Sequence, residues 1–145
     1  MPPHNRAVLT LQTSPFEGQK PGTSGLRKAV KVFQQKNYTE NFVQSTLWAM
    51  EKGLEGSVLV VGGDGRFFTD TCTSIIIRMC AANRVSKLIV GQGGFLSTPA
   101  VSNLIRKRKT SGGFIMTASH NPGGPDADFG LKFNCANGGP APDAF

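Results

Sequence analysis

The sequence has 145 residues, 39% of them hydrophobic, which is enough for one domain with a buried core. Only 17% are charged and glycine occurs 18 times, a composition typical of a compact fold with many tight turns rather than a disordered chain. No apolar run approaches the roughly 20 residues that span a bilayer, and the first residues lack the apolar stretch of a secretory signal peptide. The net charge of +7 favours an anionic partner without distinguishing nucleic acid, lipid headgroups and phosphorylated metabolites.

The three cysteines, Cys72, Cys80 and Cys135, are odd in number and lack the spacing of a metal site. In a domain with its own core this favours reduced thiols and a cytoplasmic protein. Cys80 falls on the apolar face of an expected helix, so we expect it to be buried.

The first part of the chain is expected to contain one strand and one helix. Residues 1–7 are expected to be a loose tail, and 8–13 (VLTLQT) alternate as in a half-buried strand. A glycine-rich turn at 17–28 follows. Helical spacing then predicts a helix over 38–52, with Asn37 and Glu40 as its cap.

The second part alternates strands and helices. Residues 57–66 (SVLVVGGDGR) are a nearly continuous apolar run ending in glycines, typical of a strand buried on both faces. A helix over 70–83 is expected to be capped by Asp70. The further expected elements are a strand at 87–91, a helix that begins at Thr98-Pro99 and ends in the basic run 106–109, and strands at 113–118 and 129–133.

This order predicts βαβ units, and therefore an α/β fold with a mixed, mostly parallel central sheet covered by helices on both faces. Ligands bind beyond the carboxyl ends of the strands in such sheets. The loops to consider are GGDGR (62–66), GQGGFLST (91–98) and TASHNPGGP (117–125).

The last of these loops contains Ser119 and His120 side by side. A serine-hydrolase arrangement fits poorly, because neighbouring side chains usually point apart and no G-x-S-x-G motif is present. Phosphoryl transfer fits better: a rigid loop would hold a phosphoserine while the imidazole handles a proton. The ordinary alternative is a plain turn punctuated by proline and glycine.

Two further segments carry groups suited to phosphate. In GTSGLRK (22–28), the backbone amides, Thr23, Ser24 and Arg27 could bind a phosphate, although the P-loop spacing is missing and an ordinary loop is at least as plausible. Lys132 lies in a strand-like run and is either solvated or a fixed cation beside Ser119.

Two other patterns favour no further site. The basic run 106–109 suits the end of a helix, and with one tyrosine and one tryptophan the chain lacks the aromatic platform of a nucleic-acid interface. Asp126 and Asp128 alone do not complete a magnesium shell.

Taken together, the motifs resemble one family. KPGTSGLRK, VVGGDGR, LSTPAVS, TASHNPGGP and FGLKFN…NGGPAP occur in this order and spacing between Leu11 and Pro142. The chain resembles the start of phosphoglucomutases of the eukaryotic, glucose-specific type within the phosphohexomutase superfamily. Two segments differ from the family pattern, and in one of them GQGGF (91–95) replaces the more usual Gln-Asn-Gly-Ile. Arg84 stands where relatives commonly carry glycine, and Asn83 is expected to adopt the left-handed conformation there instead.

The resemblance implies an isomerase that interconverts glucose 1-phosphate and glucose 6-phosphate through glucose 1,6-bisphosphate. It implies that Ser119 carries the catalytic phosphate and supplies one ligand to Mg²⁺ through a phosphate oxygen. His120 would be the general acid/base, Thr23, Ser24 and Arg27 would line the substrate site, and Lys132 would assist proton transfer and charge balance.

The resemblance also implies that residues 8–145 are an incomplete first domain of a larger multidomain protein. Such a piece is expected to be inactive or nearly so by itself, and the whole protein to be monomeric, to bind hexose phosphates and to bind no nucleic acid. The alternative is a noncatalytic, phosphoglucomutase-like scaffold or adhesion protein.

Overall fold

The computed structural model describes residues 7–50 and 53–145, whose centre is a five-stranded sheet in the order β1-β5-β4-β2-β3. The strands are β1 Leu26–Ala29, β2 Val58–Gly63, β3 Lys87–Phe95, β4 Gly112–Met116 and β5 Asp128–Cys135. β2 pairs in parallel with both β3 and β4. β5 runs antiparallel to β4 and to β1. The predicted α/β fold with a mixed sheet is confirmed, with parallel pairing confined to β4, β2 and β3.

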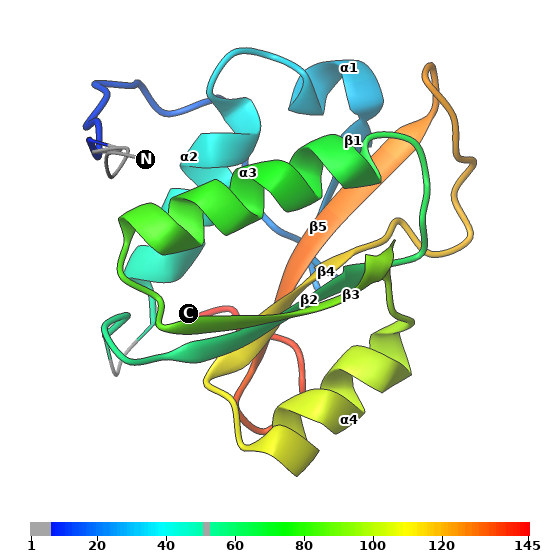
Figure 1. Ribbon diagram of the computed structural model, residues 1–145. Coiled ribbons are helices and arrows are strands. Elements are labelled where there is room, and N and C mark those ends of the chain that lie inside the picture. The colour runs from blue at the N-terminus through cyan, green and yellow to red at the C-terminus, as the bar shows by residue number, and fades with distance from the viewer. Residues whose placement is uncertain (1–6, 51–52) are drawn as a thin grey trace, which may run out of the picture.

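Helices cover both faces of this sheet (Figure 1). The helices are α1 Val30–Phe33, α2 Tyr38–Trp48, α3 Thr69–Ala82 and α4 Thr98–Arg108. α1, α2 and α3 lie on one face and α4 on the other (Figure 1). The chain passes from β2 through α3 to β3 and from β3 through α4 to β4. The loops that follow the three parallel strands therefore meet at one edge of the sheet.

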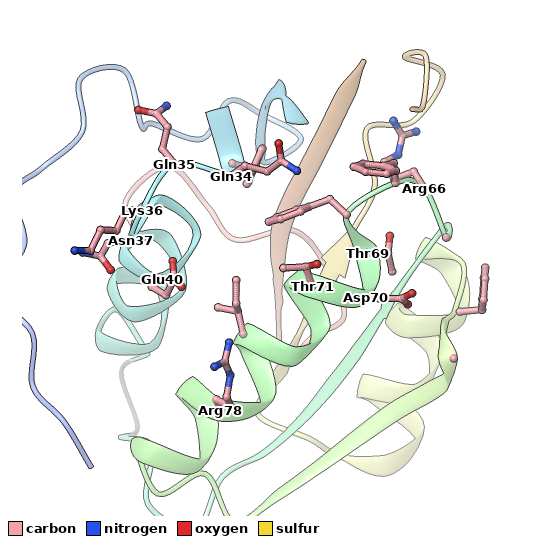
Figure 2. Close-up of a pocket in the computed structure, with 17 residues that line it drawn as sticks. Gln34, Gln35, Lys36, Asn37, Glu40, Arg66, Thr69, Asp70, Thr71 and Arg78 are labelled. Atoms are coloured by element: carbon pink, nitrogen blue, oxygen red, sulfur yellow. The ribbon is translucent and has the colours of Figure 1, made fainter. Parts of the chain in front are cut away.

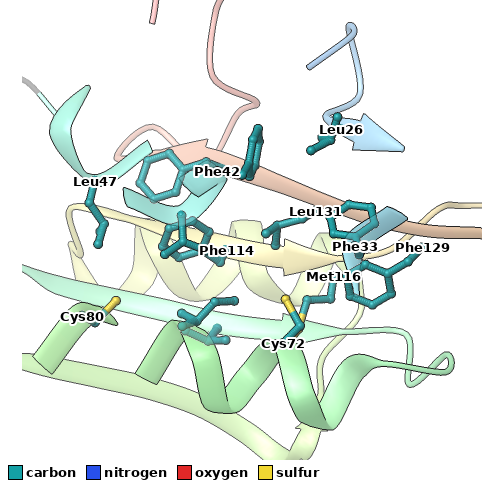
Figure 3. Packing of buried hydrophobic residues seen from close by; sticks show 14 of the residues in the cluster. Leu26, Phe33, Phe42, Leu47, Cys72, Cys80, Phe114, Met116, Phe129 and Leu131 are labelled. Atoms are coloured by element: carbon teal, nitrogen blue, oxygen red, sulfur yellow. The ribbon is translucent and has the colours of Figure 1, made fainter. Parts of the chain in front are cut away.

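The core follows from the period-two pattern of β2, whose residues 59–63 are all buried. Leu59 and Val61 face α1–α3, and Val60 packs on the opposite face with Val101 and Ile105 of α4. Figure 3 shows the larger cluster, in which Cys72 and Cys80 of α3 lie against the sheet. Cys80 is buried as predicted, and burial raises the pKa of its thiol to about 12.

An aromatic cluster holds the beginning of β5 against α1 and α3. The ring of Phe129 contacts Phe33 edge-on with centroids 4.9 Å apart, and Phe68 with centroids 5.2 Å apart. Edge-to-face packing is the favoured arrangement for such rings. Because Phe129 is the second residue of β5, this packing anchors the end of the loop that contains Ser119.

Two expectations for the first part of the chain are wrong. Residues 8–13 form no strand, and Val8, Leu9 and Leu11 are exposed. The first strand is β1, inside the segment expected to be a turn. Leu26 pairs with Leu131 of β5, and this distant partner makes the segment a strand.

Helix ends also differ from the expectations. α2 ends at Trp48 rather than at residue 52, and the Asn37 side chain makes no capping hydrogen bond. Asp70 lies inside α3, whose N-cap is Phe68. The predicted start of α4 is confirmed, with the Ser97 hydroxyl accepting a hydrogen bond from the Ala100 amide.

Asn83 does not take the left-handed conformation; Arg84 does, with φ of 62°. The Asn83 side chain instead donates hydrogen bonds to the Met79 carbonyl and to Gln44. The predicted loose tail falls almost wholly on residues 1–6, which lie outside the described residues, as do 51–52.

Candidate phosphoryl-transfer site

Ser119 lies in the loop between β4 and β5, three residues after β4 ends, and its side chain is exposed. Its backbone has φ of +55°, in the left-handed region that a serine seldom occupies. Residues held in this region cost free energy and persist where their surroundings fix them, often at functional sites.

A chain of hydrogen bonds fixes the Ser119 backbone. Its amide donates to the hydroxyl of Thr117 at 3.0 Å. That hydroxyl in turn donates to the Asp64 carboxylate at 2.7 Å. Asp64 lies in the GGDGR loop after β2, so the loops after two adjacent parallel strands are joined directly.

Arg66 makes a second connection between the same two loops. Its guanidinium forms an ion pair with Asp64 at 3.1 Å and donates to four backbone carbonyl groups, three in the β4–β5 loop and one at the first residue of β5. The acceptors are Ser119 at 3.1 Å, Asn121 at 3.3 Å, Pro122 at 3.4 Å and Asp128 at 2.9 Å. The rigidity expected of the Ser119 loop therefore has a structural source outside the loop.

The electrostatics of Asp64 agree with this arrangement. Burial by itself would raise the pKa of its carboxyl, but hydrogen bonds from Arg66 and Thr117 outweigh burial and hold the pKa below its usual value. Asp64 is therefore ionised at neutral pH, and each of its partners is a donor.

The predicted phosphate-binding loop is a tight turn. The amides and carbonyls of Gly22 and Gly25 exchange two hydrogen bonds of 3.0 Å, which leaves Thr23 and Ser24 exposed at the tip. Arg27 follows in β1, where it pairs with Gly130 of β5.

Arg27 and Lys132 are brought together, since both lie on the face of the sheet opposite the core residues Leu26 and Leu131. Burial, and then the neighbouring charge of Arg27, lowers the pKa of the Lys132 ammonium. The Nε atom of Arg27 is buried and, among the described residues, has no hydrogen-bond partner. Two close cations and an unused donor suit an anionic ligand.

Thr23 and Lys132 also line one pocket of about 610 Å³, bounded by α2 and by residues 140–145. The residues lining it do not include Ser119 or His120. Thr23 and Lys132 thus share one pocket, while Ser119 and His120 are exposed on the β4–β5 loop. Within the described ranges, neither the Ser119 hydroxyl nor the His120 ring makes a side-chain hydrogen bond, so no serine–histidine pair of the hydrolase type is formed.

A larger pocket of about 800 Å³ runs along α3 and contains none of the predicted site residues. Figure 2 shows Arg66 at one end of this pocket, with its guanidinium directed toward the β4–β5 loop. Gln34, Gln35 and Lys36, near the start of α2, line the opposite side of this pocket.

Two further observations concern metals and membranes. In residues 7–50 and 53–145, no group of three or more His, Cys, Asp or Glu side chains is placed to hold a metal ion. None of the helices in the described part of the chain is long and apolar enough to cross a membrane.

Comparison with known proteins agrees with the fold and the motifs. Residues 18–145 match the family described as phosphoglucomutase/phosphomannomutase, alpha/beta/alpha domain I. The chain belongs to this family.

Individual relatives point the same way. The chain is 69% identical over 138 residues to phosphoglucomutase 1 of Drosophila melanogaster, covering 95% of this chain and 25% of that protein. It is 57% identical over 143 residues to the cytoplasmic phosphoglucomutase of Pisum sativum, covering 94% of this chain and 25% of that protein.

Among solved structures, it matches the open form of the Paramecium exocytosis-sensitive phosphoprotein pp63/parafusin, a phosphoglucomutase. The TM-score is 0.84 with 51% identity, over 90% of this chain and 24% of the other. The chain thus spans about a quarter of the length of the relatives it matches.

Sequence reasoning named the GGDGR loop as one of three to consider but did not predict roles for Asp64, Arg66 or Thr117. Asp64 and Arg66 lie in the VVGGDGR motif and Thr117 in the TASHNPGGP motif, and each lies just after a parallel strand, but neither signal shows which atoms these residues contact. Arg66 donates to backbone carbonyl groups and Thr117 accepts from the Ser119 amide, and backbone partners leave no pattern in the sequence.

Proposed function

We propose that this chain is the phosphoserine-carrying domain of a phosphoglucomutase and that Ser119 is the phosphocarrier. The observation that carries the proposal is the exposed Ser119, whose strained backbone is held by the Thr117–Asp64 hydrogen bonds at the carboxyl edge of the parallel strands. Family membership supports the reaction class.

In the proposed reaction, the phosphoryl group leaves the Ser119 oxygen and bonds to the free hydroxyl of glucose 1-phosphate or glucose 6-phosphate. The product, glucose 1,6-bisphosphate, reorients in the site and returns its other phosphoryl group to Ser119. His120 takes the proton from the attacking sugar hydroxyl and returns a proton to the Ser119 oxygen. Thr23, Ser24 and Arg27 bind the anionic substrate, Arg27 and Lys132 offset its charge, and Lys132 also assists proton transfer.

The proposal includes Mg²⁺, which when bound would neutralise charge on the transferred group. A phosphate on Ser119 would supply one oxygen ligand and the rest of the protein the others. Activity is therefore proposed for the whole protein and not for residues 8–145 alone. We also propose a cytoplasmic monomer that binds hexose phosphates and no nucleic acid; the name of the Pisum relative supports the location.

The test is to express the protein from its complete coding sequence, incubate it with glucose 1,6-bisphosphate, and map phosphate by mass spectrometry together with mutase activity. We expect phosphate on Ser119, and loss of both phosphate and turnover in Ser119→Ala. Ser74→Ala, which changes an exposed serine on α3, is the matched control and should behave as the wild type. Full mutase activity in Ser119→Ala would refute the proposal, and an unphosphorylated, inactive wild type would favour the scaffold alternative.

A further inference from the structure

Arg66 connects two loops that are distant in sequence. Its four carbonyl acceptors lie 53 to 62 residues further along the chain and include the Ser119 carbonyl itself. All three nitrogen atoms of the guanidinium donate, since Nε bonds to Asp64, Nη2 to Asp64 and Ser119, and Nη1 to the remaining carbonyls.

The burial of Arg66 distinguishes it from the other ion-paired residues. Its side chain is 8% exposed, whereas Lys31 and Asp126, which form an ion pair at the far end of the same loop, are 73% and 77% exposed. Exposed pairs contribute little to stability, while a buried charge needs its partners to remain buried. The loop geometry therefore depends on Arg66 far more than on Lys31.

We propose that Arg66 is a positioning residue for Ser119, which fixes the backbone of the β4–β5 loop so that the Ser119 oxygen is presented in one orientation. This inference rests on the proposed function of Ser119 as phosphocarrier. Arg66 acts through the carbonyl groups of the loop, and none of its hydrogen bonds uses the Ser119 side chain.

The geometry also explains why an arginine is needed rather than any cation. A guanidinium presents five N–H donors in a fixed plane, whereas a lysine ammonium presents three from a single point. Lysine at position 66 would keep the charge beside Asp64 but would leave several carbonyl acceptors unmet. Arg66→Lys therefore separates the effect of geometry from that of charge.

The first experiment measures amide hydrogen exchange in Arg66→Lys, Arg66→Met and the wild type, with the protein expressed from its complete coding sequence. The reporters are the amides of Ser119 and Asn121, which bond within the loop, and the β2 amides report global stability. We expect exchange at Ser119 and Asn121 to be about tenfold faster in both variants, with a smaller change in β2. Lys31→Met, which removes the exposed ion pair of the same loop, should match the wild type.

The second experiment measures the rate of Ser119 phosphorylation by glucose 1,6-bisphosphate and the steady-state constants. Displacing a reacting group by about 1 Å costs on the order of 100-fold in rate, and we expect a loss of this order in both Arg66 variants. The KM for hexose phosphate should remain within about twofold, since Arg66 is proposed to position Ser119 and not to bind substrate.

The outcomes are distinguishable. An unphosphorylated wild type would refute the proposed function, while the exchange data would still show whether Arg66 fixes the loop. Wild-type exchange and phosphorylation in Arg66→Lys would overturn the inference, because charge alone would then suffice. Equal loss of protection in β2 and the loop in both variants would also overturn it, because Arg66 would then act only in folding.

Discussion

The Cα of Gly130 lies against the carbonyl group of Thr117, with no room for a side chain between them. A Cβ at Gly130 would collide with the Thr117 oxygen and would lie 2.9 Å from its carbonyl carbon and 3.2 Å from the Ala118 Cα. These are backbone atoms that cannot rotate away. The close approach accompanies the hydrogen bond from the Thr117 amide to the Gly130 carbonyl at 2.9 Å, so β5 sets where the Ser119 loop begins.

Gly130→Ala should therefore displace the loop that carries Ser119. We expect a loss of about 1–3 kcal/mol in the free energy of unfolding, the usual cost of overpacking. Phosphorylation of Ser119 should slow as well. The matched control is Gly123→Ala in the same loop, where the nearest atom, Arg66 Cβ, would lie at an ordinary 3.6 Å. Urea unfolding of both variants tests this, and equal stabilities would contradict it.

Asp64→Asn should make the protein less dependent on pH in the acid range. The folded-state pKa of Asp64 lies below its ordinary value of about 3.9, so its ionised form stabilises the fold above that pH and the contribution is lost as pH falls through the lower, folded-state pKa. We expect Asp64→Asn to be less stable by about 1 kcal/mol at pH 7. The difference in free energy of unfolding between the variant and the wild type should narrow below about pH 4.

Urea unfolding at pH 7 and at several values below pH 4 measures this difference. Asp126→Asn is the control, since its ion pair with Lys31 is well exposed and should have little effect at either pH. If the difference in free energy of unfolding between Asp64→Asn and the wild type widens as the pH falls, the prediction is contradicted.

Lys132→Met should increase stability at neutral pH while removing phosphoryl transfer. Burial, and then the charge of Arg27, lowers the pKa of Lys132, so the charged form destabilises the fold. This penalty is fully present below the folded-state pKa and is relieved as pH rises through it toward the ordinary value of about 10.4. In thermal unfolding, the Tm of Lys132→Met should exceed that of the wild type at pH 7, and the two Tm values should converge near pH 10. Lys28→Met, an exposed neighbour in β1, should change neither.

The parts of the fold that sequence predicted well are those with local signals. Strand β2 and helices α3 and α4 each show an apolar pattern that lies wholly within the segment itself. β1 has no such pattern, because only its pairing with β5, far along the chain, makes it a strand. Residues 8–13 illustrate the reverse, since they alternate as a strand should but pair with no strand of the described chain.

The residues of the candidate site also divide into those that a local sequence signal predicts and those that only distant contacts define. The motifs placed Ser119 in a loop that follows a strand and Lys132 in a strand, as the structure has them, because glycine and proline mark turns locally. They placed Arg27 in a turn, whereas it lies in β1. Arg66 was not predicted, since a buried arginine that donates to carbonyl groups looks in the sequence like any solvated arginine. The contact of Arg66 with the Ser119 loop follows from the topology, because the parallel pairing of β2 and β4 brings the loops after these two strands together.

Arg84→Gly should stabilise the protein, because Arg84 occupies the left-handed position that ends α3. Its φ is 62°, and the amide of Val85 bonds to the Cys80 carbonyl at 3.0 Å, the hydrogen bond that closes a helix at such a residue. A side chain in this conformation costs about 1 kcal/mol relative to glycine, of which the greater freedom of glycine in the unfolded chain offsets a part. The ion pair that would be lost, with Glu55 at 3.9 Å, joins side chains that are 79% and 82% exposed and contributes little. Arg84→Ala removes the same ion pair but keeps the left-handed strain, so in urea unfolding it should match the wild type while Arg84→Gly exceeds both. Equal stability of the glycine and alanine variants would show that the left-handed backbone at this position carries no cost.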